Sequence, residues 1–298
     1  MLRLGASGTG RRESAAVKVQ RLSSTDGFIV HDLDAAKTSV GVVRLAPKVL
    51  RDGAVLLARS VTYAFASFGV EGHGGASAAL NATPETRDDA LAAFVDEVRA
   101  PADAGSLVLR PGTGVTADDL DPLGWTPPDA DLLAAGALAA ARVAGPLDWR
   151  RAAVVGEGPV AEAARRQLEE AGATLAEPRY DADCDVLFVS GKAGSLDHPT
   201  AAAVTATTIV PLSEVPVTAR ALAVLGRAER VVIPDFLSTA APLLATHDPG
   251  GGDPVQRVRE SVQELADRGT GLWLAAAERA EERLAAWTDE KPFGRPLA

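Results

Sequence analysis

Lysine is scarce in this chain of 298 residues. Most of the positive charge is carried by arginine, which stays protonated in proteins and does not serve as a general base. A reaction that depends on a lysine of depressed pKa therefore has few residues to draw on. The five lysines are Lys18, Lys37, Lys48, Lys192 and Lys291. We expect Lys37 and Lys48 to be exposed, solvated side chains.

Cysteine is nearly absent as well. The single thiol, Cys184, excludes an internal disulfide and is typical of a reducing compartment. It lies in an expected strand at 184–189, which favours a packed thiol over a nucleophile. No apolar run is long enough to span a membrane, and no apolar stretch of a secretory signal follows the basic start MLRLGASGTGRR. We therefore expect a cytoplasmic protein.

Negative charge and small apolar residues dominate the composition. The formal charge of −10 and the pI near 5.0 argue against nucleic acid or an anionic membrane as a partner. Aromatic residues make up only 4% of the chain, so the core is expected to consist of Ala, Val and Leu. The four histidines are scattered without metal-ligand spacing, and no metal site is expected. They are His31, His73, His198 and His247.

A glycine turn between a strand and a helix is the most informative stretch that the chain does contain. Residues 152–155 form a short apolar run, as expected of a parallel strand buried on both faces. The pattern G-x-G-x-x-A follows at Gly156, Gly158 and Ala161, where glycines permit a tight turn and close approach to a pyrophosphate. Pro159 and Val160 then open a helix whose N-terminus offers free N–H groups to phosphate. The pattern predicts a dinucleotide site; the alternative is a Rossmann-shaped domain whose site binds nothing.

Several residues around the turn leave the identity of the dinucleotide open. Glu157 places a carboxylate between the glycines. After the second strand, at 173–176, Glu177 is positioned to accept from ribose hydroxyls, as for NAD, whereas Arg179 suits the 2′-phosphate of NADP. Ser190 and Gly191 follow the next strand and are expected near the adenosine side or the nicotinamide ribose. The cofactor is NAD or NADP.

The order of elements predicts an α/β protein of two domains, one over 14–130 with a mixed sheet and one over 131–250 with a Rossmann-type parallel sheet. We expect residues 1–13 to be disordered, a glycine-rich loop at 69–75, and a tail frayed by Pro292 and Pro296. The expected strands are 15–21, 27–32, 40–45, 77–80, 107–109, 152–155, 173–176, 185–189, 207–211 and 231–233. The expected helices are 52–68, 83–99, 131–144, 254–267 and 271–287.

Several different short motifs follow one another along the chain in a characteristic order. The first half carries Gly41-Val42-Val43-Arg44 and Leu57–Tyr63, and the second carries the glycine turn, Cys184–Leu187, Pro216-Val217-Thr218 and Ile233–Leu237. Over residues 15–287 the chain resembles the glutamate/leucine/phenylalanine/valine dehydrogenase family, most closely its leucine-dehydrogenase-like branch. The resemblance implies a substrate and oligomerisation domain at 14–130, an NAD(P)-binding domain at 131–250, and helices within 254–288 that pack across the junction.

The residues that carry out the family's chemistry are replaced in this chain. One lysine of the family fixes the substrate α-carboxylate, a second of depressed pKa activates water, and an aspartate manages protons at the amino group. The resemblance places these three at Ala64, Ala76 and Arg110. Glu214 and Pro242 stand where the family has an asparagine and a glycine on the cofactor side, and Pro242 lacks a backbone donor. We infer that the family's oxidative deamination does not operate here.

Two functions remain open after these losses. The chain is either a divergent NAD(P)-dependent oxidoreductase acting on an amine, imine or amino-acid-like substrate, or a catalytically inactive homologue that serves as a binding or assembly partner. His73 and Arg110 are the candidate catalytic groups, as an acid or base and as a carboxylate ligand respectively. Tyr63, Trp273 and Trp287 are interpreted as packing residues.

The resemblance also implies an oligomer built through the N-terminal domain. The expected strands at 15–21 and 27–32 offer an edge for pairing between subunits. A homodimer is the expected minimal unit, and a mixed oligomer with an active paralogue is the alternative.

Overall fold

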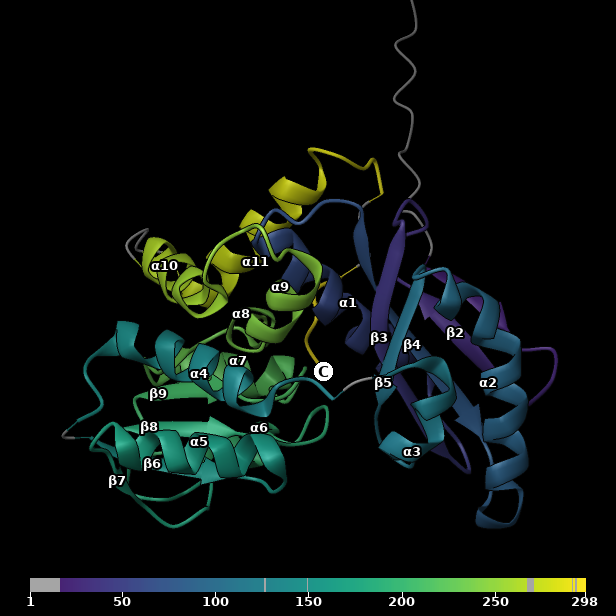
Figure 1. Cartoon of the computed structure of the whole chain (residues 1–298). Helices are drawn as coiled ribbons and strands as arrows, with labels where there is room; N and C mark the ends of the chain where they lie inside the picture. The colour runs from purple at the N-terminus through teal and green to yellow at the C-terminus, as the bar shows by residue number, and fades with distance from the viewer. Residues whose placement is uncertain (1–16, 126, 149, 267–270, 291, 293) are drawn as a thin grey trace, which may run out of the picture.

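The structure, a computed structural model, describes residues 17–125, 127–148, 150–266, 271–290, 292 and 294–298. Two five-stranded sheets, named sheet A and sheet B, lie side by side with helices on their faces and between them (Figure 1). The strands of sheet A are β1 (Lys18–Arg21), β2 (Gly27–His31), β3 (Thr38–Ala46), β4 (His73–Asn81) and β5 (Leu107–Pro111). Those of sheet B are β6 (Arg151–Val155), β7 (Thr174–Leu175), β8 (Val186–Val189), β9 (Thr208–Pro211) and β10 (Val231–Val232).

The helices include all those expected, and there are further short ones. Those expected are α1 (Arg51–Ser67), α2 (Arg87–Asp103), α4 (Ala130–Ala141), α5 (Pro159–Glu170) after the glycine turn, α10 (Pro254–Ala266) and α11 (Leu272–Leu284). The short helices are α3 (Ala117–Leu120), α6 (His198–Ala203), α7 (Ala219–Arg227), α8 (Asp235–Ser238) and α9 (Ala241–His247), with 3-10 turns η1 (Pro84–Thr86), η2 (Asp121–Leu123) and η3 (Arg142–Ala144). Residues 1–13 and 267, which the expectations above include, lie outside the described residues.

Sheet A is mixed, as predicted. Its order is β1-β2-β4-β3-β5; β2 runs antiparallel to β1 and β4, whereas β3 runs parallel to β4 and β5. The first described strand, β1, therefore forms one edge, and β5 forms the edge nearer sheet B (Figure 1).

The expected glycine-rich loop at 69–75 is wrong in its second half, because β4 already begins at His73. Gly75 lies inside that strand, where a Cβ atom would overlap the carbonyl oxygen of Ala58 on α1. Its amide donates to Thr62 Oγ1 of α1 at 2.9 Å. Glycine is therefore needed here because helix and sheet are in close contact. In the sequence alone, such glycines look the same as the glycines of a loop.

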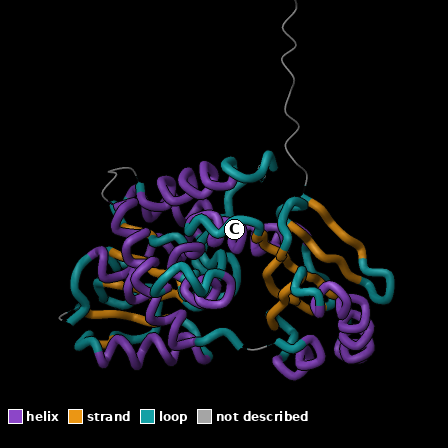
Figure 2. The backbone as a smooth tube through the Cα atoms, turned by 45° about the horizontal axis from the view of Figure 1, so that its top comes forward, coloured by secondary structure: helices purple, strands orange, loops and turns teal. Residues whose placement is uncertain are grey.

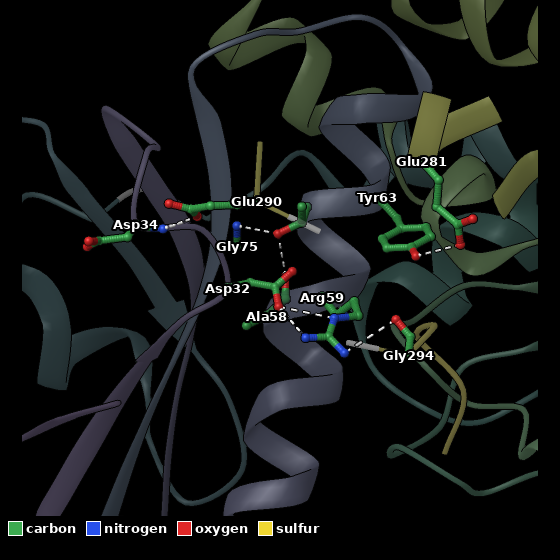
Figure 3. A network of polar contacts seen from close by, with 10 residues as sticks. Asp32, Asp34, Ala58, Arg59, Tyr63, Gly75, Glu281, Glu290 and Gly294 are labelled. Atoms are coloured by element: carbon green, nitrogen blue, oxygen red, sulfur yellow. Dashed lines mark hydrogen bonds and ion pairs between the residues drawn. The ribbon is translucent and has the colours of Figure 1, made fainter. Parts of the chain in front are cut away.

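Helix α1 is the structural link between the two halves of the molecule. It packs on β4 on one side and on α8 and α11 on the other, so most of its residues from Ala54 onward are buried. Arg59 of α1 forms a buried ion pair with Asp32, with Arg59 Nη2 2.8 Å from Asp32 Oδ1 (Figure 3). Tyr63 is buried, as predicted, and its hydroxyl donates to Glu281 of α11 at 3.0 Å.

Sheet B is entirely parallel, in the order β10-β9-β8-β6-β7, with helices on both faces. Alternate residues of β8 face opposite ways: Val186 and Phe188 join the core that includes α4 and α5, whereas Leu187 and Val189 pack with α6 and α7. This two-sided burial explains the uninterrupted apolar run in the sequence. Together the two sheets confirm the predicted α/β class with a Rossmann-type half.

The last helices and the end of the described chain lie along the junction of the two halves. Helix α10 packs on α4, and α11 packs on α1. Residues 294–298, named the tail, continue into the space between the sheets, where Figures 1 and 2 place the C-terminus. The expectation of a frayed tail is wrong for these residues, because the amide of Ala219 donates to the Ala298 main-chain oxygen at 2.9 Å. None of the described helices is both long and apolar enough to cross a bilayer.

Candidate functional site

The backbone of the glycine turn has positive φ angles, which are strained for any residue other than glycine. It joins β6 to α5, with φ of 112° at Gly156 and 90° at Gly158, and Pro159 begins the helix. A Cβ at Gly156 would overlap the carbonyl oxygen of Ser190, whereas a Cβ at Gly158 would have no heavy atom within 4 Å. The turn therefore lies against the end of β8 and leaves open space above Gly158. In an open α/β sheet this place, where the strand order reverses, is where ligands bind.

Arg165 of α5 adds a positive charge that the sequence motif does not indicate. Its Nη2 donates to the carbonyl oxygens of Val154 and Gly156, at 3.0 and 2.6 Å. Glu157, by contrast, is exposed. The turn thus carries one cation held against its backbone and one solvated carboxylate. An anionic group at the turn would be attracted by the first and repelled by the second.

Beyond β7, the two residues that left the cofactor open are found close together. Arg179 donates to both carboxylate oxygens of Asp181, at 2.9 and 2.7 Å, and lies 3.5 Å from a Glu177 oxygen. The hydrogen bond and charge of Asp181, with the charge of Glu177, raise the pKa of Arg179. The guanidinium is therefore balanced by two carboxylates, and a 2′-phosphate would have to compete with both.

The loops that follow β8 and β9 are tied to the turn and to each other. The Ser190 amide donates to the Val155 carbonyl at 2.8 Å. The Ser213 hydroxyl accepts from the Gly191 amide at 3.1 Å and donates to the Gly191 carbonyl at 2.6 Å. The structure thus brings Gly156, Ser190 and Gly191 together at one edge of sheet B, as a shared site requires.

Arg110 and Glu214 form an ion pair across the cleft between the sheets. Arg110 is on β5 of sheet A, and Glu214 follows β9 of sheet B. Their side chains retain 27% and 19% of their exposed area, so the pair is neither fully buried nor fully solvated. Two positions that looked like separate losses in the sequence are therefore partners in the structure.

Asp235 of α8 holds a strained residue next to this pair. Val215, which precedes a proline, has φ of 52°, a value unfavourable for a β-branched residue. Asp235 Oδ2 accepts from the Val215 amide at 2.9 Å and from the Ser60 hydroxyl of α1 at 2.6 Å. Burial raises the pKa of Asp235 to about 6, and the negative charge of Glu214 acts in the same direction. The sequence motif contained Asp235 but did not indicate this role.

The positions at which the resemblance expects lysines are closed to solvent. Ala64 and Ala76 are 2% and 1% exposed, in the cores on either side of α1 and β4. The lysines that the structure describes, at 18, 37, 48 and 192, are all exposed, as predicted for Lys37 and Lys48. Lys291 lies outside the described residues. Within the described part of the chain, no lysine is buried at the cleft to serve as a base of depressed pKa.

His73 does not lie in a cleft loop as expected, because it is the first residue of β4. Its ring packs against those of Phe65 and His247, with centroids 4.9 and 5.3 Å away. Across the parallel strands, His73 pairs with Thr38 at the amino end of β3, whereas Arg110 pairs with Val42 farther along. The two candidate catalytic residues are therefore four residues apart along β3 and do not face each other across the sheet.

A cavity of about 570 Å³ lies between β5, the connection to α4, and α9. Arg110 and Glu214 form its polar wall, and His247 is part of its lining. Pro242, near the start of α9, also lines it. The rest is largely apolar and includes Leu109, Trp125, Leu132 and Leu243. The glycine turn is not part of this lining, so turn and cavity are separate features of one cleft.

Cys184 is buried, and burial raises the pKa of its thiol, in agreement with a packed residue. Among the described residues, no group of three or more His, Cys, Asp or Glu side chains is placed to hold a metal ion.

Comparison with known proteins shows similarity in structure only. No protein-family model matches the sequence, and no curated protein matches it either. L-tryptophan dehydrogenase from Nostoc punctiforme superposes with a TM-score of 0.68 at 20% identity, covering 92% of this chain and 96% of that one. A hetero-hexameric glutamate dehydrogenase from Thermus thermophilus, in a Leu-bound form, gives 0.70 at 20% identity over 91% and 89%.

A further glutamate dehydrogenase gives a TM-score of 0.75 at 16% identity, covering 92% of this chain and 86% of that one. At such identities the likeness establishes the fold, which is that of amino-acid dehydrogenases, along nearly the whole of both chains. It carries no information on which residues act.

Proposed function

We propose that this chain is a divergent nicotinamide-dinucleotide-dependent oxidoreductase that acts on an amine or imine without lysine chemistry. The observation that carries the proposal is the glycine turn, whose positive φ angles and open space above Gly158 suit a diphosphate at the N-terminus of α5. Arg165 supports it by adding a cation to the turn. Gly156, Pro159, Val160, Ser190 and Gly191 complete the proposed site.

NAD is the better of the two cofactors for this site. Arg179, the candidate ligand for a 2′-phosphate, is already paired with Asp181 and Glu177. Glu177 is exposed just beyond β7, and its second carboxylate oxygen, Oε1, can accept from ribose hydroxyls while Oε2 faces Arg179.

The reaction is proposed to be hydride transfer to a preformed imine that is already protonated, which gives the amine without a further proton. When bound, the cofactor supplies the hydride, and the protein supplies position and an apolar surrounding. The apolar cavity excludes water, and Arg110 is suited to orient a substrate carboxylate once Glu214 is displaced from it. No step in this scheme needs a lysine to activate water, which agrees with Ala64 and Ala76 at the family's lysine positions.

Titration calorimetry with NAD and NADP in both redox states tests the cofactor. Glu157→Gln should lower the Kd severalfold, because it removes a carboxylate from between the glycines. Glu170→Gln is the matched control, since it removes the same charge at the other end of α5. If no dinucleotide gives heat or a thermal shift at millimolar concentration, the proposed site is wrong.

Turnover is tested by following the absorbance of the reduced nicotinamide with preformed imines and with the common amino acids. We expect imine reduction and no amino-acid oxidation. Oxidation of an amino acid at an ordinary rate, on the order of 1–1,000 per second, would contradict the proposal. Arg110→Met should raise the KM for a carboxylate-bearing imine more than for an imine without a carboxylate.

A catalytically inactive partner protein is the second candidate. It is favoured by the absence of a buried lysine at the cleft among the described residues and by the hetero-hexameric assembly named for the Thermus thermophilus enzyme. Cofactor binding without turnover, together with co-purification of an active paralogue, would select this candidate. Under either candidate, we propose a homo-oligomer or mixed oligomer joined along the β1 edge of sheet A. Light scattering that returned only a 30.7 kDa species at micromolar concentration would contradict it.

A further inference from the structure

Three charged side chains are among the described residues that line the cavity, and each has a partner within the protein. Arg110 and Glu214 pair with each other. Asp129 accepts from the amide of Leu132 at 3.0 Å and caps α4. Burial lowers the pKa of His247, which also lines the cavity, to about 4, so its ring is neutral at pH 7. A charged ligand in the cavity therefore has to compete with the pair of Arg110 and Glu214.

Glu214 is held at the cavity by the residues on either side of it. The Ser213 hydroxyl accepts from the Gly191 amide at 3.1 Å and donates to the Gly191 carbonyl at 2.6 Å. The Val215 amide donates to the buried carboxylate of Asp235 at 2.9 Å. Because both neighbours are fixed to the sheet B half, the carboxylate of Glu214 remains at the cavity when the ion pair opens.

Opening the pair costs more for a ligand of one charge than for a ligand of both. The side chains of Arg110 and Glu214 keep 27% and 19% of their exposed area, so each is poorly solvated once its partner is taken away. A simple carboxylate would pair with Arg110 and leave Glu214 without a cation, and a simple amine would leave Arg110 without an anion. A ligand that carries both charges replaces both partners at once. The pair is therefore selective for a zwitterion.

The position of Glu214 indicates which cation it receives. Ser213, the residue before it, is bonded to Gly191 of the proposed dinucleotide site. This wall of the cavity therefore adjoins the cofactor, where the reacting nitrogen of an iminium substrate has to lie. The rest of the lining is largely apolar and suits the apolar part of such a ligand.

The substrate also has to reach the cavity as an intact imine. Among the described residues, no lysine is buried at the cleft to assemble one there from an amine and a carbonyl compound. An open-chain imine hydrolyses in water, whereas a ring imine persists, because the ring holds the amine next to the carbonyl carbon and favours their recombination. The cavity of about 570 Å³ has room for such a ring with a fused or attached apolar group.

We propose that the pair of Arg110 and Glu214 is the recognition element for a cyclic iminium carboxylate with an apolar substituent, Arg110 binding its carboxylate and Glu214 its iminium N–H. The assignment of a ring imine rests on the proposed function, whereas the selectivity for a zwitterion rests on the pair alone. In the reduction the imine carbon gains a hydride from the reduced nicotinamide, which is oxidised, and the C=N π pair moves to nitrogen. The neutral secondary amine then takes a proton from water, and Glu214 stays ionised throughout.

Three ring compounds of nearly the same shape test the two charges separately, in the absence of dinucleotide. Tetrahydroisoquinoline with a carboxylate on the carbon next to nitrogen carries both charges and belongs to the product class. Tetralin carboxylate carries the anion alone, and unsubstituted tetrahydroisoquinoline carries the cation alone. Calorimetry with the full chain at pH 7 should give the zwitterion a Kd about tenfold lower than either of the others, because each of those leaves one charge of the pair without a partner.

Variants of the pair should change this order in opposite directions. In Glu214→Gln no carboxylate is left unpaired, so tetralin carboxylate should bind about tenfold more tightly than it does to the wild type. In Arg110→Met the unsubstituted amine should gain in the same way. Asp129→Asn is the matched control, because it removes a negative charge from the same cavity while its amide oxygen can still cap α4. It should keep the order of the wild type.

Two results of this titration would each overturn the proposal. One is wild-type protein that binds tetralin carboxylate as tightly as the zwitterion, and the other is a Glu214→Gln variant that keeps the wild-type order. Failure of all three compounds to bind any of the four proteins at millimolar concentration would overturn it as well.

Turnover distinguishes this inference from the proposed function. The absorbance of the reduced nicotinamide is followed with dihydroisoquinoline carboxylate, the ring imine of the same skeleton, and we expect the wild type to reduce it. Selectivity for the zwitterion without reduction by NADH or NADPH would support the role of the pair and overturn the proposed oxidoreductase, the ring imine included. Reduction without that selectivity would support the oxidoreductase and overturn the role of the pair.

Discussion

Arg110 of β5 and Glu214 of the loop after β9 are 104 residues apart in sequence and form an ion pair across the cleft. Each stands where the resemblance expects a different residue. Their pairing balances one positive and one negative charge at the cleft. Both residues line the cavity, where the pair forms its polar wall.

A double-mutant cycle tests whether the ion pair between Arg110 and Glu214 stabilises the folded protein. Arg110→Met and Glu214→Gln should each lower the free energy of unfolding, and the pair should show a coupling energy of about 1 kcal/mol, typical of partly exposed ion pairs. Urea unfolding at low and at high salt provides the measurement. Additive effects, with no salt dependence, would show that the pair contributes nothing.

The two glycines of the turn should differ in their tolerance of alanine. Gly158→Ala should cost about 1–3 kcal/mol, the strain of its backbone conformation, because the space around it is open. Gly156→Ala should cost more, because its new Cβ would overlap Ser190 in addition to the strain. Thermal unfolding of both variants provides the comparison, and an equal or reversed order would contradict the turn geometry.

Asp235→Asn should change the dependence of stability on pH. In the wild type the pKa of Asp235 is raised to about 6 by burial, so folding favours its protonated form and stability falls as pH rises from about 4 to about 6. The loss is at most about 3 kcal/mol. Asparagine does not titrate, and its amide oxygen can still accept from Ser60 and Val215. Urea unfolding between pH 4.5 and 8 should show the variant gaining on the wild type as pH rises; parallel curves would contradict this.

His247→Phe should act in the opposite pH direction. Burial and the charge of His73 lower the pKa of His247 to about 4, so its neutral form is favoured in the folded protein. Stability from this group is complete above pH 6.5 and is lost as pH falls towards 4. Phenylalanine keeps a ring against Phe65 and His73 without titrating. The decrease in Tm between pH 7 and 5 should be smaller in the variant, and an unchanged decrease would refute the assignment.

Elements whose cause is local could be predicted from the sequence. The turn from Gly156 to Pro159 depends on backbone requirements within four residues, and the structure places it between β6 and α5 as expected. The strand expected at 152–155 was identified because burial on both faces requires an uninterrupted apolar run, and the structure has it as β6. The spacing of apolar residues at helical intervals likewise predicted the amphipathic helices α1, α10 and α11.

Features that depend on distant neighbours were missed or misread. The start of β4 looked like a loop, but its glycines serve close packing and not a turn: a Cβ at Gly75 would overlap Ala58 of α1, and a Cβ at Gly74 would meet Ala36 and Leu33. The helices α8 and α9 are too short to show a period. Two prolines in and before the tail predicted fraying, yet contacts with α1, α7 and α11 order residues 294–298.

The sequence by itself determined the α/β class and the glycine turn, since each depends on residue type and spacing alone. Only the tertiary structure decided that Arg110 and Glu214 are partners, that Asp235 holds Val215, and that residues 294–298 contact α1, α7 and α11. Such contacts join residues brought together by the packing of two sheets around α1, and no local pattern of residues encodes that packing.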